Sequence, residues 1–462
     1  MGSKTRRFDA TLPKLPTGRN FEIPWDEGRG RLMKNKTMKA GWAASILVVA
    51  GVASAGPSMP IETRAMGMGG TGVASANALS AAFYNPAMLS MQREQDDFAL
   101  LLPFIAAGGA LDDELIDDID DIQDQKLFER FEDSVNQYNT INSQSSKEEI
   151  DAALDEVIDS ARTLDRALTK IDHAATRLDA SAALALAVPS DSLGFSVFTT
   201  LRLTGTALVS YRDSQTINEY IELAEQIKNN NSLAVDLQDV ETRLESDARV
   251  IGVAINEIGV SLSRQFDVGI PLAIGVTPKY LRAISFDYTA EIEDFDEDDF
   301  DASEFEEEDS AMSLDIGVAT AFGEEKQWIV GASIRDITSP EFETVAGQKI
   351  ELNPRLLVGT AYRGGWFNWA LDFDLTKNDG VGFESESQFL STGAEFNVLD
   401  TIQLRVGGRM NISDDKAESD SLESDSLLTA GVGIAFFGAH LDFSAVKSSE
   451  EVAVGAELAF DI

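Results

Sequence analysis

The chain has 462 residues, no cysteine and a formal net charge of −42, and these properties exclude several classes of protein. Without cysteine there are no disulfides, thiolate metal sites or thiol nucleophiles, which suits an oxidising compartment. A chain this acidic repels phosphate, so no nucleic-acid partner is expected. No apolar run reaches the roughly 20 residues of a membrane-spanning helix. Soluble proteins and membrane β-barrels remain.

The first 55 residues have the pattern of an exported precursor. Three lysines between positions 34 and 39 precede a small, apolar run that ends in Ala-Ser-Ala at position 55. Positive charge, a short apolar stretch and small residues at the exit define a secretory signal peptide. We therefore expect a signal peptide at residues 38–55, cleavage after Ala55, and an upstream extension without a fold at residues 1–37.

The segment at residues 56–96 is rich in glycine and is predicted to be a plug inside a barrel. Four glycines fall within six residues, and an Asn-Pro-Ala triplet follows: Gly67, Gly69, Gly70, Gly72, Asn85, Pro86 and Ala87. Glycine permits positive φ and close backbone approach, which a compact segment threaded through a barrel requires. A phosphate-binding loop is the alternative, but the run lacks a Walker lysine and no strand precedes it.

From residue 97 to residue 462 the chain reads as segments in which apolar and polar residues alternate. In the clearest one, the odd-numbered positions from Phe367 to Leu375 are apolar and most of the even-numbered ones are polar. This alternation indicates strands with one apolar face. In a soluble sandwich the apolar face would meet a second sheet, whereas in a membrane barrel it would meet lipid while the polar face lines the lumen.

The number of strands and the lengths of their connections favour the barrel. Strands are predicted near 97–106, 177–188, 193–212, 248–265, 269–292, 310–321, 327–338, 350–363, 366–376, 385–397, 401–412, 425–437, 439–447 and 451–461. Connections after even-numbered strands are short, and those after odd-numbered strands are mostly long. A single-chain outer-membrane barrel requires this rhythm. We predict an all-β, transmembrane antiparallel barrel of about 14 strands in the outer membrane of a Gram-negative bacterium.

Three outer connections are expected to carry insertions. Residues 111–176 have apolar positions at helical spacing and a capping box, Ser146-Lys-Glu-Glu149, which predict a helical hairpin. Residues 213–247 are expected to form a shorter helical loop. These helices either cap the barrel mouth or bind a protein partner. The run 291–309 holds thirteen acids but lacks the glycine-turned loop of a calcium site, so it is interpreted as a solvated loop facing lipopolysaccharide.

Charged residues on the polar face of the strands are predicted to line the lumen as a ladder of opposite charges: Arg355, Arg363, Asp372, Asp374, Glu395, Arg405, Arg409 and Glu457.

Gly205, inside a long strand, is a candidate for a kink in the wall, or it only accommodates curvature. His173 and His440 are the chain's two histidines, and no serine is placed beside them. Neither enzymatic activity nor a cofactor or metal is expected.

The glycine run and the Asn-Pro-Ala triplet resemble the N-terminal plug of the FadL/OmpP1/TodX family of outer-membrane transporters. The resemblance is confined to the plug segment. It implies a 14-stranded barrel and the passive, porin-like uptake of hydrophobic small molecules. The acidic helical loops are more similar to the branch named for conjugal transfer TraF-like proteins. That branch suggests the alternative, a structural or adhesive outer-membrane component of a conjugation-type or surface assembly.

Overall fold

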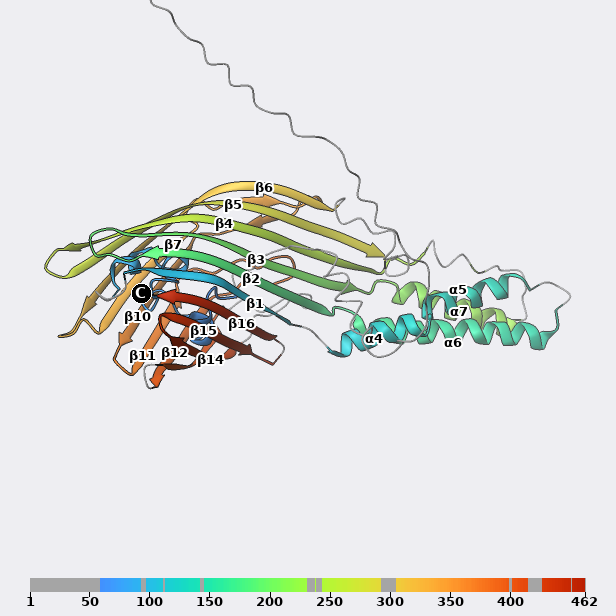
Figure 1. Cartoon of the computed structure of the whole chain (residues 1–462). Helices are drawn as coiled ribbons and strands as arrows, with labels where there is room; N and C mark the ends of the chain where they lie inside the picture. The colour runs from blue at the N-terminus through green and yellow to red at the C-terminus, as the bar shows by residue number, and fades with distance from the viewer. Residues whose placement is uncertain are drawn as a thin grey trace, which may run out of the picture. The chain divides into compact units, whose positions relative to one another are not determined.

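The computed structural model describes residues 59–92, 97–110, 113–141, 145–230, 237, 243–291, 305–398, 401–413, 426–449 and 451–461. The predicted signal peptide, its cleavage site at Ala55 and the upstream extension lie outside the described residues. In the described part, fourteen antiparallel strands close into one barrel, and the first strand pairs with the last (Figure 1). The predicted fold class is therefore confirmed.

Each of the fourteen predicted strands is present. The barrel strands are β1 (Ala99–Ala110), β2 (Ala175–Val188), β3 (Gly194–Ser210), β4 (Asp247–Asp267), β5 (Pro271–Glu291), β6 (Glu306–Phe322), β7 (Trp328–Arg335), β10 (Arg355–Arg363), β11 (Phe367–Asp374), β12 (Phe389–Val398), β13 (Ile402–Asn411), β14 (Leu427–Phe436), β15 (Ala439–Lys447) and β16 (Glu451–Asp461). Two short strands, β8 (Glu341–Glu343) and β9 (Lys349–Glu351), form a separate hairpin in the connection between β7 and β10.

The short connections gather at one end of the barrel, which we call the turn rim, and the long ones at the other, the loop rim. The tightest turn joins β14 to β15 through Phe437 and Gly438, both with positive φ (52° and 78°). Two consecutive residues with positive φ match the right-handed twist of the flanking strands. The Phe437 side chain is 94% exposed, which places an aromatic ring at the outside of this rim.

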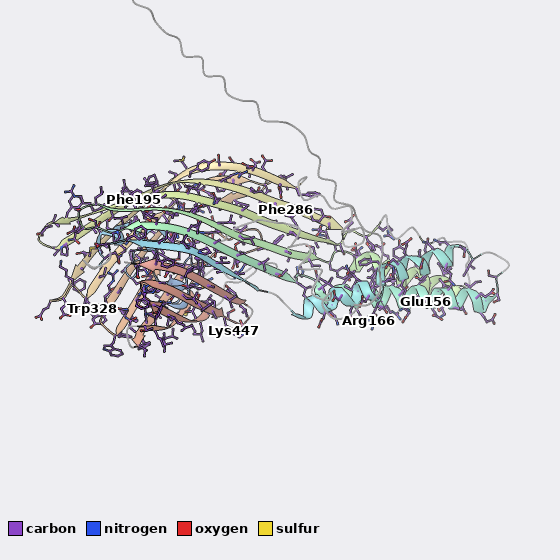
Figure 2. All side chains as sticks on the ribbon, viewed as in Figure 1. Glu156, Arg166, Phe195, Phe286, Trp328 and Lys447 are labelled. Atoms are coloured by element: carbon purple, nitrogen blue, oxygen red, sulfur yellow. The ribbon has the colours of Figure 1, made fainter. Side chains whose placement is uncertain are left out.

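The outward face of the barrel is apolar. Large exposed hydrophobic side chains recur on alternate positions of neighbouring strands, among them Leu404, Val406, Ile434, Leu441 and Val454. Aromatic side chains gather near the turn rim, where Phe195 and Trp328 are visible in Figure 2. An apolar band bordered by aromatic residues is the surface that a lipid bilayer requires of a barrel. Among the described residues, no helix is long and apolar enough to cross a membrane.

The acidic run at 291–309 is not a loop throughout. β5 ends at Glu291, within the predicted strand 269–292, but β6 begins at Glu306, so the last four residues of the run are strand and the prediction was wrong there. Residues 292–304 lie outside the described residues. The acidic strand residues are held by cross-strand pairs. Arg282 Nε lies 2.6 Å from Glu308 Oε1, and the rings of Tyr288 and Phe305 are 4.6 Å apart.

The first two long connections form a bundle of four helices. The helices are α4 (Asp113–Asp124), α5 (Leu127–Asn139), α6 (Lys147–Ile171) and α7 (Ser214–Asn230). The predicted hairpin partner of α6 is broken into two helices, because Lys126 has a left-handed backbone conformation (φ 51°). The predicted capping box of Ser146 and Glu149 is present. The apolar faces pack into a core of their own, in which Phe131 and Tyr220 meet edge to face.

Replacing Leu154 by alanine tests whether this core holds the bundle together. Leu154 is fully buried in α6, and a cavity of that size costs about 2–5 kcal/mol of unfolding free energy. We expect helical circular dichroism to melt at a lower temperature while the barrel keeps its heat-modifiable migration in electrophoresis. Thr169→Ala, on the exposed side of the same helix, is the control. Equal melting of the two variants would contradict this role of the core.

Candidate functional site

The lumen is filled by the segment of residues 59–92, which we call the plug. It contains α2 (Thr63–Gly67), α3 (Ala81–Tyr84) and a 3-10 helix, η1 (Pro86–Ser90). Its apolar side chains are fully buried against small inward-facing wall residues; examples are Met66, Met88 and Leu89. The plug is thus packed against the wall as a core.

The motif glycines are needed where plug backbone meets wall backbone. Gly69 has a φ of +72°, and an added Cβ would lie 2.5 Å from Gly408 O and 2.7 Å from Thr392 O. An added Cβ on Gly72 would overlap the ring of Tyr84 inside the plug itself. The first glycine therefore permits docking against β12 and β13, and the second permits the internal fold of the plug.

The wall contributes glycines of its own to this contact. A Cβ added to any of nine wall glycines would meet plug atoms: Gly194, Gly275, Gly317, Gly331, Gly359, Gly393, Gly407, Gly431 and Gly455. Several lie opposite each other across strand pairs, as Gly275 does with Gly317 and Gly393 with Gly407. Because these paired glycines have no side chains, the plug backbone can approach the wall backbone closely.

The Asn-Pro-Ala triplet forms the start of η1. The Asn85 side chain accepts a hydrogen bond from Ala87 N at 3.1 Å and donates to Val73 O at 2.8 Å. It also donates to Val318 O in β6 at 3.2 Å. Pro86 occupies the first helical turn, where a missing N–H costs nothing. One asparagine thus joins two parts of the plug to the wall.

Wall side chains satisfy the polar backbone of the plug. The Asp372 carboxylate accepts hydrogen bonds from Gly72 N at 2.6 Å and Val73 N at 2.9 Å. Glu457 accepts from Thr63 N at 3.0 Å. The Arg363 guanidinium donates to plug carbonyl oxygens, including Met91 O at 2.8 Å. These three predicted lumen residues therefore contact the plug.

The remaining members of the predicted ladder contact one another or an aromatic ring. Arg405 Nε lies 2.9 Å from Glu395 Oε2, and Arg355 Nη2 lies 3.1 Å from Asp374 Oδ2. Glu395 also binds plug residue Arg64 at 2.9 Å. Two residues outside the predicted ladder also contact it. Asp442 forms an ion pair with Arg405, and the ring centroid of Phe389 lies 4.2 Å from the guanidinium carbon of Arg409.

The pairing register shows where the barrel wall is irregular. Gly205 pairs with Leu178 and Gly252 in continuous register, so β3 has no register shift there. The irregularity in the wall instead lies in β1, between Leu101 and Phe104, on both of its edges. Proline at position 103 explains it, because proline cannot donate to the ladder.

Each histidine lies beside an aspartate. His440 Nε2 lies 2.6 Å from Asp461 Oδ1. His173 lies 3.4 Å from the neighbouring Asp172. Among the described residues, no group of three or more aspartate, glutamate, histidine or cysteine side chains could hold a metal ion.

Two long connections fold inward and cover the lumen from the loop rim. The β8–β9 hairpin buries Phe342 and Ile350 against the inner faces of β4 and β5. The connection between β11 and β12 buries Val381 in the same cluster, and Phe383 N donates to Thr206 Oγ1 in β3 at 3.3 Å. The connection therefore crosses from one wall to the other.

A buried arginine fixes this crossing connection. The Arg177 guanidinium lies 2.8 Å from Asp179, 3.1 Å from Glu384 and 2.7 Å from Glu451. Asp179 shares β2 with the arginine, Glu451 begins β16, and Glu384 belongs to the connection. Arg177 is 1% exposed, so each of these charge pairs is shielded from solvent screening.

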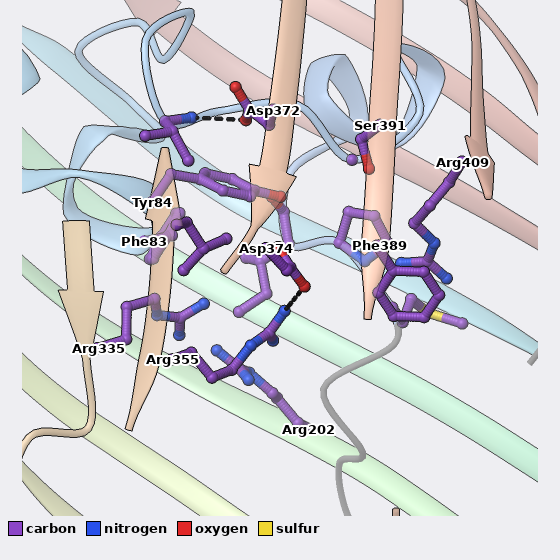
Figure 3. Close-up of a pocket in the computed structure, with 16 residues that line it drawn as sticks. Phe83, Tyr84, Arg202, Arg335, Arg355, Asp372, Asp374, Phe389, Ser391 and Arg409 are labelled. Atoms are coloured by element: carbon purple, nitrogen blue, oxygen red, sulfur yellow. Dashed lines mark hydrogen bonds and ion pairs between the residues drawn. The ribbon is translucent and has the colours of Figure 1, made fainter. Parts of the chain in front are cut away.

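Besides a cavity of about 40 Å³ at the inward-folded connections, two cavities lie on opposite sides of the plug. The one toward the turn rim has a volume of about 380 Å³, and its lining includes Arg64, His440 and Asp461. The one toward the loop rim is smaller, about 60 Å³. Aromatic residues and arginines line it, among them Tyr84, Phe389, Arg202, Arg335, Arg355 and Arg409 (Figure 3). The plug separates the two spaces.

Part of this site escaped sequence reasoning. Arg202 and Arg335 were not singled out, although both lie on strands whose apolar alternation was recognised. Arg177 and Glu384 are 207 residues apart, and no local pattern joins them. The wall glycines carried a signal that could have been used, because glycine recurs in nearly every predicted strand from β5 onward.

Comparisons with known proteins give one family. Residues 82–374 match the family model described as "F plasmid transfer operon, TraF, protein". A comparison with curated protein sequences finds no match. Solved structures that match include the toluene transporter TodX of P. putida, with 10% identity over 87% of this chain and 99% of that chain and a TM-score of 0.48.

Two other solved structures match over similar spans. The toluene transporter TbuX of Ralstonia pickettii has 11% identity over 88% of this chain and 98% of that chain, with a TM-score of 0.46. A Pseudomonas aeruginosa FadL homologue has 10% identity over 89% of this chain and 99% of that chain, with a TM-score of 0.48.

Alanine at Gly69 tests the seating of the plug. The positive φ at this position lowers the free energy of unfolding of the variant by about 1 kcal/mol. In addition, the new Cβ clashes with the wall backbone. Gly70→Ala is the matched control, because Gly70 has a φ of +86° but its nearest added contact is the Pro60 side chain at 3.3 Å. We expect Gly69→Ala alone to raise ionic conductance in planar bilayers. Equal conductance of the two variants would show that backbone approach is not limiting.

The plug is also expected to respond to pH through Glu62. Burial raises the pKa of the Glu62 carboxyl to about 7, although Arg64 and Arg405 oppose this shift. Because the folded-state pKa is raised, the neutral form contributes fully below pH 4.5, and its contribution of about 3 kcal/mol is lost as pH rises through 7. Amide protection factors in residues 59–92, which correct for the faster intrinsic exchange at high pH, should therefore be lower at pH 8 than at pH 5. In Glu62→Gln this difference should shrink, and an unchanged difference would refute the assignment.

Proposed function

This chain belongs to the family described as "F plasmid transfer operon, TraF, protein", the branch expected from the sequence, and we propose that its barrel is a gated outer-membrane channel. In this proposal the channel admits small molecules with an apolar part by passive diffusion. The observation that carries it is a pair of adjoining cavities that share three arginines, Arg202, Arg335 and Arg355. Plug residues such as Tyr84 line the one of about 60 Å³, and residues of the inward-folded connections such as Val381 line the one of about 40 Å³. A site between two closures suits alternate opening toward each rim.

The outer surface supports a location in the outer membrane of a Gram-negative bacterium. Apolar side chains such as Leu404 and Val454 cover the strands on the outside, while charged pairs such as Arg405 and Glu395 occupy the inside. A closed barrel has no unpaired strand edge, so lipid can surround it on all sides. With the short turns in the periplasm, the helical bundle and the inward-folded connections would face the outside of the cell.

The closures are built so that a ligand could displace them. Toward the loop rim, the crossing connection depends on the buried pair of Arg177 and Glu384. Toward the turn rim, the plug depends on hydrogen bonds from its backbone to Asp372 and Glu457. A ligand shifts such an equilibrium only by the difference between its affinities for the open and closed states. Passage by this route needs no energy source other than the concentration gradient.

A structural or adhesive role in a surface or conjugation-type assembly is the second candidate. The observation that favours it is the helical bundle, which has its own apolar core and therefore its own basis for stability. Its surface carries exposed ion pairs such as Arg162 with Glu225, as a water-facing or protein-binding surface would. The description of the family names a plasmid transfer operon, which is compatible with a role in assembly.

Uptake by proteoliposomes separates the two candidates and tests the gate. Radiolabelled toluene and a radiolabelled fatty acid serve as the probes. Glu384→Gln weakens the buried pair, and a loss of roughly 1–3 kcal/mol from the closed state would raise uptake about 5- to 150-fold if opening limits the rate. The matched control is Glu386→Gln, whose carboxylate lies 3.0 Å from Lys377 in the same connection but is exposed.

The channel proposal requires that the native chain take up at least one probe and that Glu384→Gln, but not Glu386→Gln, increase uptake. If neither probe enters with the native chain or with Glu384→Gln, the channel proposal is wrong. In that case, loss of cell-to-cell adhesion or plasmid transfer on removal of the helical bundle would support the assembly role.

A further inference from the structure

The cavity toward the loop rim is lined by more cationic than anionic side chains. Four arginines and two aspartates contribute to its lining: Arg202, Arg335, Arg355, Arg409, Asp372 and Asp374. Oδ2 of Asp372 accepts both hydrogen bonds from the plug backbone, while its Oδ1 has no hydrogen-bond partner. Asp374 lies 3.1 Å from Arg355 Nη2. Figure 3 shows the side chains of Arg202, Arg335 and Arg355 converging beside Asp374.

The carboxylates behind these arginines are shared with a buried lysine. Lys279, which is 1% exposed, lies 3.4 Å from Glu257, 3.1 Å from Asp315 and 2.8 Å from Asp336. Glu257 also reaches Arg202 Nη2 at 3.4 Å. These acids balance the interior charge from the wall side. Glu257 and Asp336 line a second cavity of about 40 Å³ that the arginines share, and neither acid lines the cavity of about 60 Å³.

Two guanidinium nitrogens at this cavity lack a hydrogen-bond acceptor. Arg202 Nε and Arg335 Nε are both buried, and neither has a hydrogen-bond partner. A buried donor without an acceptor costs about 1–3 kcal/mol, and more if it is charged. Such donors are therefore usually satisfied by bound water or by a ligand. Both arginines line the space of about 60 Å³, so a ligand there would lie beside the two side chains that carry these unpaired donors.

We propose that this cavity is a binding subsite for a compact oxyanion, the carboxylate or phosphate group of a small molecule. Arg202, Arg335 and Arg355 bind the oxyanion, and the rings of Tyr84 and Phe389 contact the remainder of the ligand. Guanidinium groups match the planar and tetrahedral geometry of these oxyanions and bind them through paired hydrogen bonds. This inference deepens the proposed function by adding an anionic group to the molecules that enter the lumen.

The size of the cavity restricts the ligand. One water needs about 10–15 Å³ when volume is measured in this way, so a cavity of about 60 Å³ accommodates an oxyanion with few further atoms. A long acyl chain does not fit beside the arginines while the closures are in place. The subsite therefore favours short, compact acids or phosphate over long-chain amphiphiles.

Equilibrium dialysis of the full-length chain in detergent tests the subsite, with radiolabelled acetate and inorganic phosphate in separate arms. We expect saturable binding of at least one probe, and the arm that binds identifies the oxyanion. Arg335→Gln should weaken that binding about tenfold or more, and Arg335→Lys should restore part of it, because lysine keeps the charge without the planar fork. Arg282→Gln is the matched control, since Arg282 is half exposed and paired with Glu308.

A second variant tests the subsite without replacing an arginine, in case the arginine variants do not fold. Ser391 also lines the cavity, and Ser391→Asp would place a carboxylate beside the arginines while leaving all four in place. We expect this variant to keep the heat-modifiable migration of a folded barrel and to lose binding of both probes.

Three results would overturn the subsite: no saturable binding in either arm, equal loss of binding in Arg335→Gln and Arg282→Gln, or full binding by Ser391→Asp. The dialysis does not depend on transport. Saturable, Arg335-dependent binding by a chain that transports neither toluene nor the fatty acid would support the subsite and reject only the channel. Transport without such binding would support the channel and reject the subsite.

Discussion

The structure depends on the approach of one backbone to another inside a closed barrel. A segment threaded through a lumen must satisfy its own N–H and C=O groups there, because unpaired buried groups destabilise the fold. Here the wall meets this need in two ways. Glycines such as Gly275 and Gly407 remove the side chains that would hold the plug away, and acids such as Asp372 accept hydrogen bonds from plug N–H groups. The charged lumen face is therefore largely an interface with the plug.

The fold could be predicted because its signals are local. A period of two residues identifies strands, and the alternation of short and long connections distinguishes the barrel from a sandwich. Glycine spacing identified the plug, since a close approach such as that of Gly69 tolerates no other residue. The capping box at Ser146 gave the start of α6 for the same reason: its interactions span three residues.

The rest of the site depends on contacts between distant segments. The pair of Arg177 and Glu384 requires a connection to fold inward across the lumen, and hydrophobic periodicity does not specify that path. The predicted ladder was partly realised, because Arg405 and Glu395 do pair. Arg363, however, binds plug carbonyls, since the sequence did not show how closely the plug fills the bore. The acidic residues around Glu308 were assigned to a loop because their cross-strand partner Arg282 is 26 residues away.

The pairing of β1 with β16 has a consequence for the order of assembly. Ala99 pairs with Asp461, so closing this seam joins the two most distant strands of the barrel and carries a large loop-closure entropy. β16 also provides Glu457, which binds Thr63 in the plug. A plug that already occupies the growing sheet can therefore act as a template that fixes the register of the last strand. A barrel sealed beforehand would have to reopen its seam to take up this segment.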